Sequence, residues 1–265
     1  MIDDRIRVQS QLYPWILLSV LNRKKQGLGG AFKAGKPYPD RPVCVTSRDT
    51  GRAVIWDPVS AEVSLVNQPD PDVLKSGIGF AFADSRKTVS FFETGAINPL
   101  TMRHLHRLVS WKRLLQHLLT VQDELGSKNW ERLSDERLLE KTLITLFSAV
   151  AGLNGLAQLD AFTSDLMHHL SKGLIHITTG GVEGEMATLG IDNGQLLWLD
   201  PDASLDGYSV DFTFRNIRTA WMCVANLTDN LAAVGKGDIK LRGYIPLADG
   251  FNHMLDRLQM FVKVG

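Results

Sequence analysis

Hydrophobic and polar residues alternate along two separate stretches of the chain, and each stretch predicts a β-strand that runs into an amphipathic helix. Residues 77–95 read GIGFAFADSRKTVSFFETG, and residues 208–227 read YSVDFTFRNIRTAWMCVANL. In the first half of each stretch every second residue is large and apolar, which places these side chains on one face of a strand. The apolar residues of the second half follow a helical period. The pattern therefore predicts the same strand–helix unit twice.

A second similarity lies upstream of each stretch. Residues 49–58 read DTGRAVIWDP and residues 192–201 read DNGQLLWLDP, with Asp, Gly, Asp and Pro at the same spacing. Asp, Asn and Gly tolerate the backbone angles of tight turns, and proline ends a strand. A strand is expected before each turn, at 43–45 and 186–190, so each motif predicts a β-hairpin. Together the similarities predict an internal duplication of an α+β unit.

Helical periodicity marks the middle of the chain. Ser134 is a favoured helix N-cap, acidic residues follow it, and apolar residues recur at helical spacing through 138–150. We expect Gly152 and Gly155 to end this helix, and a second helix to follow over about 157–170. The two helices predict a helical hairpin that connects the α+β units.

The N-terminal segment has an apolar core from Leu12 to Leu21 with Pro14 inside it. This core is too short to span a bilayer, which takes about 20 residues, and the acidic start is unlike a signal peptide. We expect a short helix that begins near Pro14 and packs on a hydrophobic core. The alternative is an interfacial helix whose Trp15 and Ile16 enter a membrane surface. Because no transmembrane helix is predicted, the expected location is cytoplasmic.

Composition narrows the class of protein. A chain of 265 residues, 44% hydrophobic and 22% charged, is typical of a folded soluble protein. Its 29 basic and 29 acidic residues cancel, which argues against a dedicated nucleic-acid-binding protein. The two cysteines have no metal or redox spacing and are expected as buried thiols. The predicted segments are an N-terminal helix (1–26), a first α+β unit (27–125), a helical connector (126–172) and a second α+β unit (173–265).

Motifs for catalysis or metal binding are not found. The sequence has no G-x-S-x-G, P-loop, dinucleotide-binding or H-E-x-x-H motif. His104-x-His106 and His168-His169 are paired histidines, but neither pair has a third ligand at a recognisable spacing. No catalytic residue, metal or cofactor is therefore predicted.

The last part of the chain resembles a known family. After the strand and helix of 210–227, Gly235-Lys236-Gly237 forms a turn, residues 238–243 read DIKLRG, and an amphipathic helix follows over 247–261. This order is similar to the C-terminal half of a sterol carrier protein 2 (SCP2) domain.

The first copy contains a different fragment of the same family pattern. Residues 95–99 read GAINP, which resembles the family's G-K-L-N-P, and a strand at 103–109 and a helix at 111–119 would follow. The chain thus resembles two tandem SCP2-like units, the first of them divergent.

The resemblance implies a curved five-stranded sheet covered by helices, with an apolar tunnel for a fatty acyl chain, a sterol or a related lipid. Such a tunnel needs large apolar side chains, and methionine adapts well to hydrophobic ligands. The alternative is that the same side chains fill a closed core. The residues expected to bind the ligand are Phe212, Phe214, Trp221, Met222, Ile239, Leu241, Met254, Leu258, Met260 and Phe261.

Residues 103–118 contain the most basic stretch of the chain. Its cationic residues are Arg103, Arg107, Lys112 and Arg113. Each basic residue near an anionic membrane gains about 1 kcal/mol, so transient membrane contact is expected here. The alternative is an ordinary solvated face of a packed helix.

Carriage of a hydrophobic small molecule without covalent chemistry is the leading functional hypothesis. The expected partners are the ligand and, transiently, an anionic membrane, with no nucleic acid; homo-oligomer formation stays open. The alternatives are an enzyme or enzyme accessory acting on a lipid-like substrate, as in quinone or steroid metabolism, and a protein-interaction module with a collapsed pocket.

Overall fold

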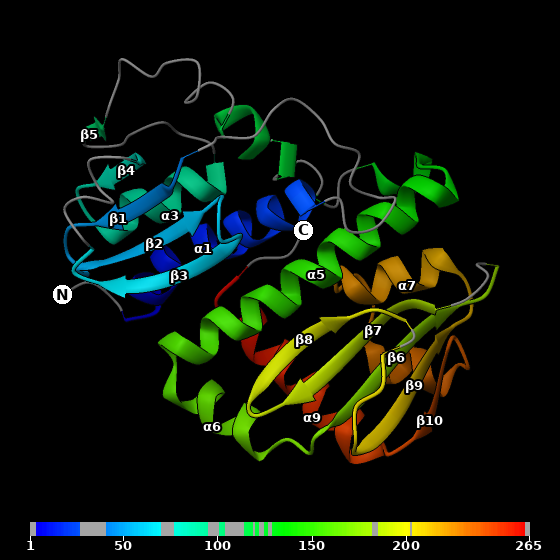
Figure 1. Ribbon diagram of the computed structural model, residues 1–265. Helices are drawn as coiled ribbons and strands as arrows, with labels where there is room; N and C mark the ends of the chain where they lie inside the picture. Colours follow the sequence, from blue (N-terminus) through cyan, green and yellow to red (C-terminus); the bar gives the residue numbers. More distant parts are fainter. Residues whose placement is uncertain are drawn as a thin grey trace. The chain divides into compact units, whose positions relative to one another are not determined.

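The structure is a computed structural model that describes residues 4–26, 41–69, 77–94, 101–103, 114–118, 120–121, 125–126, 129–181, 185–201 and 203–262 (Figure 1). The chain divides into two compact units, Met1–Glu124 and Leu125–Gly265. Both units combine helices with a mixed sheet, so the predicted α+β class is confirmed. The N-terminal helix groups with the first unit and the helical connector with the second.

The first unit contains a five-stranded sheet with the order β3-β2-β1-β4-β5. Strands β1 and β4 pair in parallel, whereas β1–β2, β2–β3 and β4–β5 are antiparallel. The strands are β1 (Val43–Ser47), β2 (Arg52–Asp57), β3 (Glu62–Asn67), β4 (Ile78–Phe82) and β5 (Thr101–Arg103).

The second unit contains a five-stranded sheet with the order β10-β9-β6-β7-β8. Strands β6 and β9 pair in parallel, whereas β6–β7, β7–β8 and β9–β10 are antiparallel. The strands are β6 (Gly173–Thr179), β7 (Glu185–Asp192), β8 (Gln195–Leu199), β9 (Tyr208–Phe214) and β10 (Ile239–Gly243). Read in chain order, the two sheets have the same strand order and the same pairing directions.

The two sequence similarities fall differently on this common topology. The strand–helix similarity lies on equivalent elements, because β4 and β9 hold the same place in their sheets and each leads into a helix. The Asp-x-Gly motif does not lie on equivalent elements. In the first unit it forms the turn between β1 and β2, and in the second unit it forms the turn between β7 and β8. Both hairpins exist, but reading them as equivalent copies was wrong, since the shared residues reflect only the chemistry of a tight turn: Gly51 and Gly194 both have positive φ.

Helix α1 (Asp4–Gln26) begins ten residues before the proline that was expected to start it. Proline inside a helix removes one hydrogen bond and costs about 3 kcal/mol. Burial offsets this cost: Leu12, Val20 and Leu21 are fully buried, and the helix packs against β2, β3 and α3 (Ser85–Thr94). Trp15 is only 9% exposed, which agrees with a helix docked on a core and not with an interfacial helix.

The second unit begins with a long helix. A 3-10 turn, η2 (Trp130–Arg132), precedes α5 (Asp135–Leu159), and Ser134 caps α5 as predicted by accepting a hydrogen bond from the Arg137 amide. Gly152 and Gly155 do not end α5, contrary to expectation. Each glycine costs a helix about 1 kcal/mol. Fully buried Leu153 and Leu156 outweigh that cost, since both keep the helix packed to its end.

The remaining helices of the second unit are short. They are α6 (Ala161–His169), α7 (Ile217–Val224), α8 (Asn230–Gly235) and α9 (Ile245–Gln259). Helix α5 contacts α6, α7, α9 and β8, while α7 and α9 each contact β9. In Figure 1, α7 and α9 lie on the same side of the second sheet.

Within the described residues, α5 is the one helix whose length and composition would allow it to cross a membrane. Its most apolar window is 61% buried inside the protein. A buried core helix passes the same test of length and hydropathy, and α5 is packed against four other elements of its own unit. The expected cytoplasmic location stays a prediction.

Candidate functional site

Alternation along the strands decides which residues of the second sheet face the helices. The ring of Trp198 in β8 lies 5.6 Å from the ring of Phe147 in α5, centroid to centroid. The strand register places Leu189, Ile175 and Val210 in the same row across the sheet as Trp198. Because residues of one row share a face, this row points towards α5. We call this face of the second sheet the helix side.

Four of the predicted ligand-binding residues lie on the helix side of β9 and β10. Phe212 and Phe214 follow Val210 at intervals of two, and they pair across the strands with Leu241 and Ile239, respectively. Phe214 and Ile239 are buried, at 6% and 4% exposure. Phe212 and Leu241 are only partly buried. The two cross-strand pairs therefore differ in access to solvent.

Helices α7 and α9 supply most of the other predicted residues. Trp221 of α7 and Met254 of α9 are both fully buried. Met222 is partly buried. Met260 is an exception, because its side chain is 55% exposed and adds to the outer surface. We call the following residues the helix-side layer: Phe212, Phe214, Trp221, Ile239, Leu241, Met254, Leu258 and Phe261.

Polar atoms without a partner lie beside this layer. Thr179 is on the helix side of β6, next to Phe214 in the register. Among the residues that the structure describes, its buried Oγ1 has no hydrogen-bond partner, and neither has the buried Nε1 of Trp221. Buried polar groups in proteins are nearly always hydrogen-bonded, so each exception needs an explanation. A ligand or water oxygen at these positions would provide it.

A cation is also buried beside the layer. Lys141 of α5 is 8% exposed, and its Nζ lies 5.1 Å from the centroid of the Trp221 ring. Sequence reasoning missed Lys141 and Thr179. The available signal was that Lys141 falls three residues after Leu138, on the face of α5 that the apolar spacing predicts to be buried.

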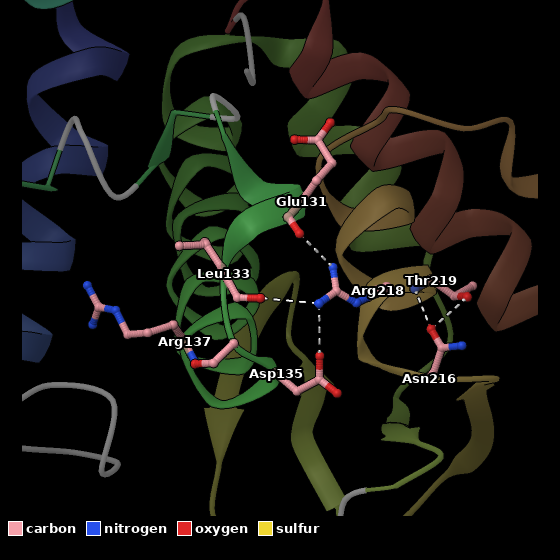
Figure 2. Close-up of polar contacts among 8 residues, drawn as sticks. Glu131, Leu133, Asp135, Arg137, Asn216, Arg218 and Thr219 are labelled. Atoms are coloured by element: carbon pink, nitrogen blue, oxygen red, sulfur yellow. Dashed lines mark hydrogen bonds and ion pairs between the residues drawn. The ribbon is translucent and has the colours of Figure 1, made fainter.

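Arg218 fixes the start of α7 against the start of α5. Figure 2 shows its guanidinium donating hydrogen bonds to the carbonyl oxygens of Glu131 and Leu133, each at 3.2 Å. The same group pairs with the Asp135 carboxylate at 3.4 Å. One guanidinium offers five N–H donors in a fixed plane, which suits three acceptors. Arg218 thereby holds together the two helices that carry Trp221 and Lys141.

Arg257 joins α9 to the start of α6. It donates to both carboxylate oxygens of Asp160, at 3.1 and 2.9 Å, and Asp160 also caps α6 by accepting from the amide and hydroxyl of Thr163. Burial alone would raise the pKa of Asp160, but the hydrogen bonds from Arg257 and Thr163 outweigh it and hold this pKa below its ordinary value. The pair anchors α9 and, with it, the α9 side of the helix-side layer.

The predicted membrane-contact residues cannot be placed together. Arg103 ends strand β5, while Arg107, Lys112 and Arg113 lie outside the described residues, as do His104 and His106. Of the predicted strand at 103–109 the structure describes only residue 103, and of the predicted helix at 111–119 it shows residues 114–118 as helical. Membrane contact stays a prediction.

Potential metal ligands and thiols are placed more clearly. His168 and His169 are exposed, and the Nδ1 of each bonds the backbone carbonyl four residues earlier. In the described part of the chain, no group of three or more His, Cys, Asp or Glu side chains could hold a metal ion. Cys44 and Cys223 are buried free thiols, as expected.

Comparisons with known proteins do not identify a family. No protein-family model matches the chain, and no curated protein matches it at a significant level. The resemblance to SCP2 domains therefore stays a prediction.

Proposed function

We propose that the second unit binds a hydrophobic small molecule, such as a fatty acyl chain, a sterol or a related lipid, against its helix-side layer, without covalent chemistry. The observation that carries the proposal is the partial exposure of Phe212 and Leu241. These residues face each other on the helix side, yet their neighbours Phe214 and Ile239 are buried. A large apolar pair that remains accessible at the margin of a buried layer suits the entrance of a ligand site.

The first unit supplies a contrast. Phe80 in β4 corresponds to Phe212 in β9, because each lies five residues before the helix that follows its strand. Phe80 is buried, and its ring lies 6.2 Å from Phe82 and 5.5 Å from Phe91. An aromatic cluster of this kind fills a core without a ligand. We therefore assign ligand binding to the second unit and a packed, structural core to the first.

Burial of an alkyl chain alone could give useful affinity at the proposed site, without a specific polar contact. Each buried methylene group gains about 0.8 kcal/mol, so a chain of about ten methylenes gains about 8 kcal/mol, equivalent to a micromolar dissociation constant. The orphan hydroxyl of Thr179, next to Phe214, adds a single hydrogen-bonding position to the otherwise apolar surface. The common topology of the two sheets also supports the proposal that the chain arose by duplication of an SCP2-like unit.

Titration with an environment-sensitive fluorescent fatty-acid analogue tests the proposal. The unmodified protein should bind the probe saturably, and unlabelled lipid should displace it. Phe212→Glu places a charge in the layer and should weaken binding at least about tenfold, since burying an unpaired charge is costly. Asp211→Asn is the matched control, because Asp211 is the preceding residue of β9 and is exposed on the opposite face.

Circular dichroism of each variant shows whether the fold is retained. Saturable binding that Phe212→Glu weakens and Asp211→Asn leaves intact supports the proposal. Equal binding by the unmodified protein and a folded Phe212→Glu variant contradicts it.

A further inference from the structure

A pair of buried hydroxyl groups ties a central strand of the first unit to the helix that covers it. The Oγ of Ser47, at the end of β1, and the Oγ1 of Thr88, in the first turn of α3, lie 2.6 Å apart. Both side chains are buried, at 5% and 0% exposure. Each hydroxyl therefore has a hydrogen-bond partner, and neither is left for a ligand.

The second unit keeps the hydroxyl on the strand but loses its partner on the helix. Ser47 in β1 and Thr179 in β6 each pair with the last residue of the neighbouring parallel strand. Helices α3 and α7 each begin three residues after that strand ends, so their fourth residues, Thr88 and Ala220, are equivalent. Alanine has no hydroxyl. The buried Oγ1 of Thr179 accordingly has no hydrogen-bond partner among the described residues.

The next residue of α7 adds a polar atom that the first unit does not have. Trp221 is equivalent to Val89 by the same alignment, and its indole Nε1 is buried without a partner in the part of the chain that the structure describes. An indole N–H can only donate, and buried polar groups are nearly always hydrogen-bonded. Both unpartnered atoms therefore occur where the second unit differs in sequence from the first.

We infer that Thr179 and Trp221 bind a single uncharged oxygen of the ligand, which takes the place of the missing Thr88 hydroxyl. The inference rests on the proposed function and names the ligand class, an apolar molecule with one hydroxyl or carbonyl group. A carbonyl oxygen has two lone pairs and can accept from both the indole and the threonine. A hydroxyl can accept from the indole and donate to Thr179. The apolar body then lies against the helix-side layer.

Burial favours a neutral group over an anion at this position. Thr179 is 4% exposed, Trp221 is fully buried, and neither side chain carries a charge. A carboxylate or phosphate would lose its hydration here, and a buried charge is costly unless it is paired. The Lys141 ammonium lies over the face of the Trp221 ring and has further contacts of its own, whereas the indole N–H donates in the plane of that ring. The ammonium is therefore not part of the position that we assign to the ligand oxygen.

Competition between oleyl alcohol and the corresponding octadecene, which has the same chain without the oxygen, tests the inference by native mass spectrometry. The unmodified protein should prefer the alcohol about tenfold, because the alcohol satisfies two buried groups. Thr179→Val removes the hydroxyl at nearly constant size and should lower the preference about threefold or more. Thr178→Val, the same substitution on the opposite face of β6, is the matched control and should retain the preference.

A second variant transfers the hydroxyl pair of the first unit to the second. Thr179→Ser combined with Ala220→Thr reproduces the pair of Ser47 and Thr88, so that each hydroxyl has a partner without a ligand. This double variant should lose the preference for the alcohol and still bind the octadecene. Circular dichroism shows whether each variant is folded. A folded double variant, or a folded Thr179→Val variant, that retains the full preference overturns the inference.

The possible results separate the inference from the function on which it rests. Equal uptake of alcohol and octadecene by the unmodified protein means that water satisfies the two buried atoms, and it overturns the inference while the proposed function stands. Tighter binding of oleate than of oleyl alcohol also overturns it, because the site then selects a charged group. If the unmodified protein takes up none of the three probes, the proposed function fails, and the inference fails with it.

A measurement on the unmodified protein covers the case in which the variants do not fold. In ¹H–¹⁵N spectra, one of the six tryptophan indole N–H resonances should move downfield when oleyl alcohol binds and should not do so with octadecene, because only the alcohol offers an acceptor. The absence of any alcohol-specific shift among these resonances overturns the inference.

Discussion

The ion pair between Arg257 and Asp160 allows a quantitative test of how α9 is anchored. Its side chains are 25% and 17% exposed, and its two hydrogen bonds are 3.1 and 2.9 Å long. Exposed pairs contribute about 0–1 kcal/mol, whereas removing one partner of a buried pair costs about 3–5 kcal/mol. For this mostly buried, bidentate pair we expect Asp160→Asn to lower the free energy of unfolding by about 2 kcal/mol, midway between these limits.

Asparagine is the informative replacement because it retains the cap. Asn is as good a helix N-cap as Asp, so the hydrogen bond to the Thr163 amide survives and only the ion pair is lost. Asp160→Ala would lose about 1 kcal/mol more through the missing cap. Asp165→Asn, on the exposed face of α6, is the matched control and should have little effect.

Urea unfolding followed by circular dichroism, with a double-mutant cycle through Arg257→Met, measures the coupling. We expect the two single substitutions to be strongly non-additive, with a coupling of about 1 kcal/mol or more. Additive effects, or a loss below about 0.5 kcal/mol in Asp160→Asn, would refute the assignment of this pair as an anchor.

The same pair predicts a dependence on pH. The pKa of Asp160 is lower in the folded protein than its ordinary value of 3.8, so the unfolded chain binds the proton first as the pH falls. The stabilisation is therefore complete well above pH 3.8 and is lost as the pH falls through the lowered, folded pKa. The stability difference between the unmodified protein and Asp160→Asn should shrink in this acidic window. A difference that stays constant down to pH 2.5 or so would contradict the lowered pKa.

Three further predictions concern single contacts. Arg218→Met should destabilise the second unit by about 1–2 kcal/mol and speed amide exchange at the start of α5, whereas Arg215→Met, whose side chain is 72% exposed, should not. Asn154→Ala removes the hydrogen bonds with both the amide and the carbonyl of Leu196 in β8, so the Leu196 amide should exchange markedly faster. In a variant that lacks Cys44, Cys223 should react with a thiol reagent at pH 8 only after unfolding. Burial, and to a smaller extent the carboxylate of Asp238, raise the pKa of the Cys223 thiol to about 11. Fast reaction of the native protein would contradict the burial of Cys223.

The strand and helix types could be predicted because they depend on local patterns. Apolar and polar residues alternate over 208–214, and apolar residues follow a helical spacing after Ser134. Both patterns indicate which side chains are buried, and the structure has β9 and α5 at these places. The ends of elements depend on tertiary packing instead. In an isolated helix Pro14 would mark the first turn and Gly152 the last. Buried neighbouring residues instead keep both helices continuous through these positions.

The candidate site could be predicted only in part. Large apolar residues of the second unit were identifiable by their spacing, and the structure places most of them in one layer. Lys141 and Thr179 were missed because lysine and threonine are usually exposed, although the spacing from Leu138 places Lys141 on the face of α5 that is predicted to be buried. The Asp-x-Gly motif led to a wrong equivalence between two hairpins. The same turn residues are favoured in any tight turn between strands, so they do not show which hairpin of a fold they belong to.

Mass spectrometry of the natively purified protein tests whether the second unit binds a hydrophobic molecule. We expect a fraction of the protein to carry one such molecule, which denaturation releases and which is identifiable as a fatty acid, a sterol or a related lipid. Incubation with oleate should restore a bound species in the unmodified protein and not in Phe212→Glu. A protein that carries no lipid when purified, and that acquires none from excess oleate or sterol, would contradict the claim that the second unit is a carrier of hydrophobic molecules.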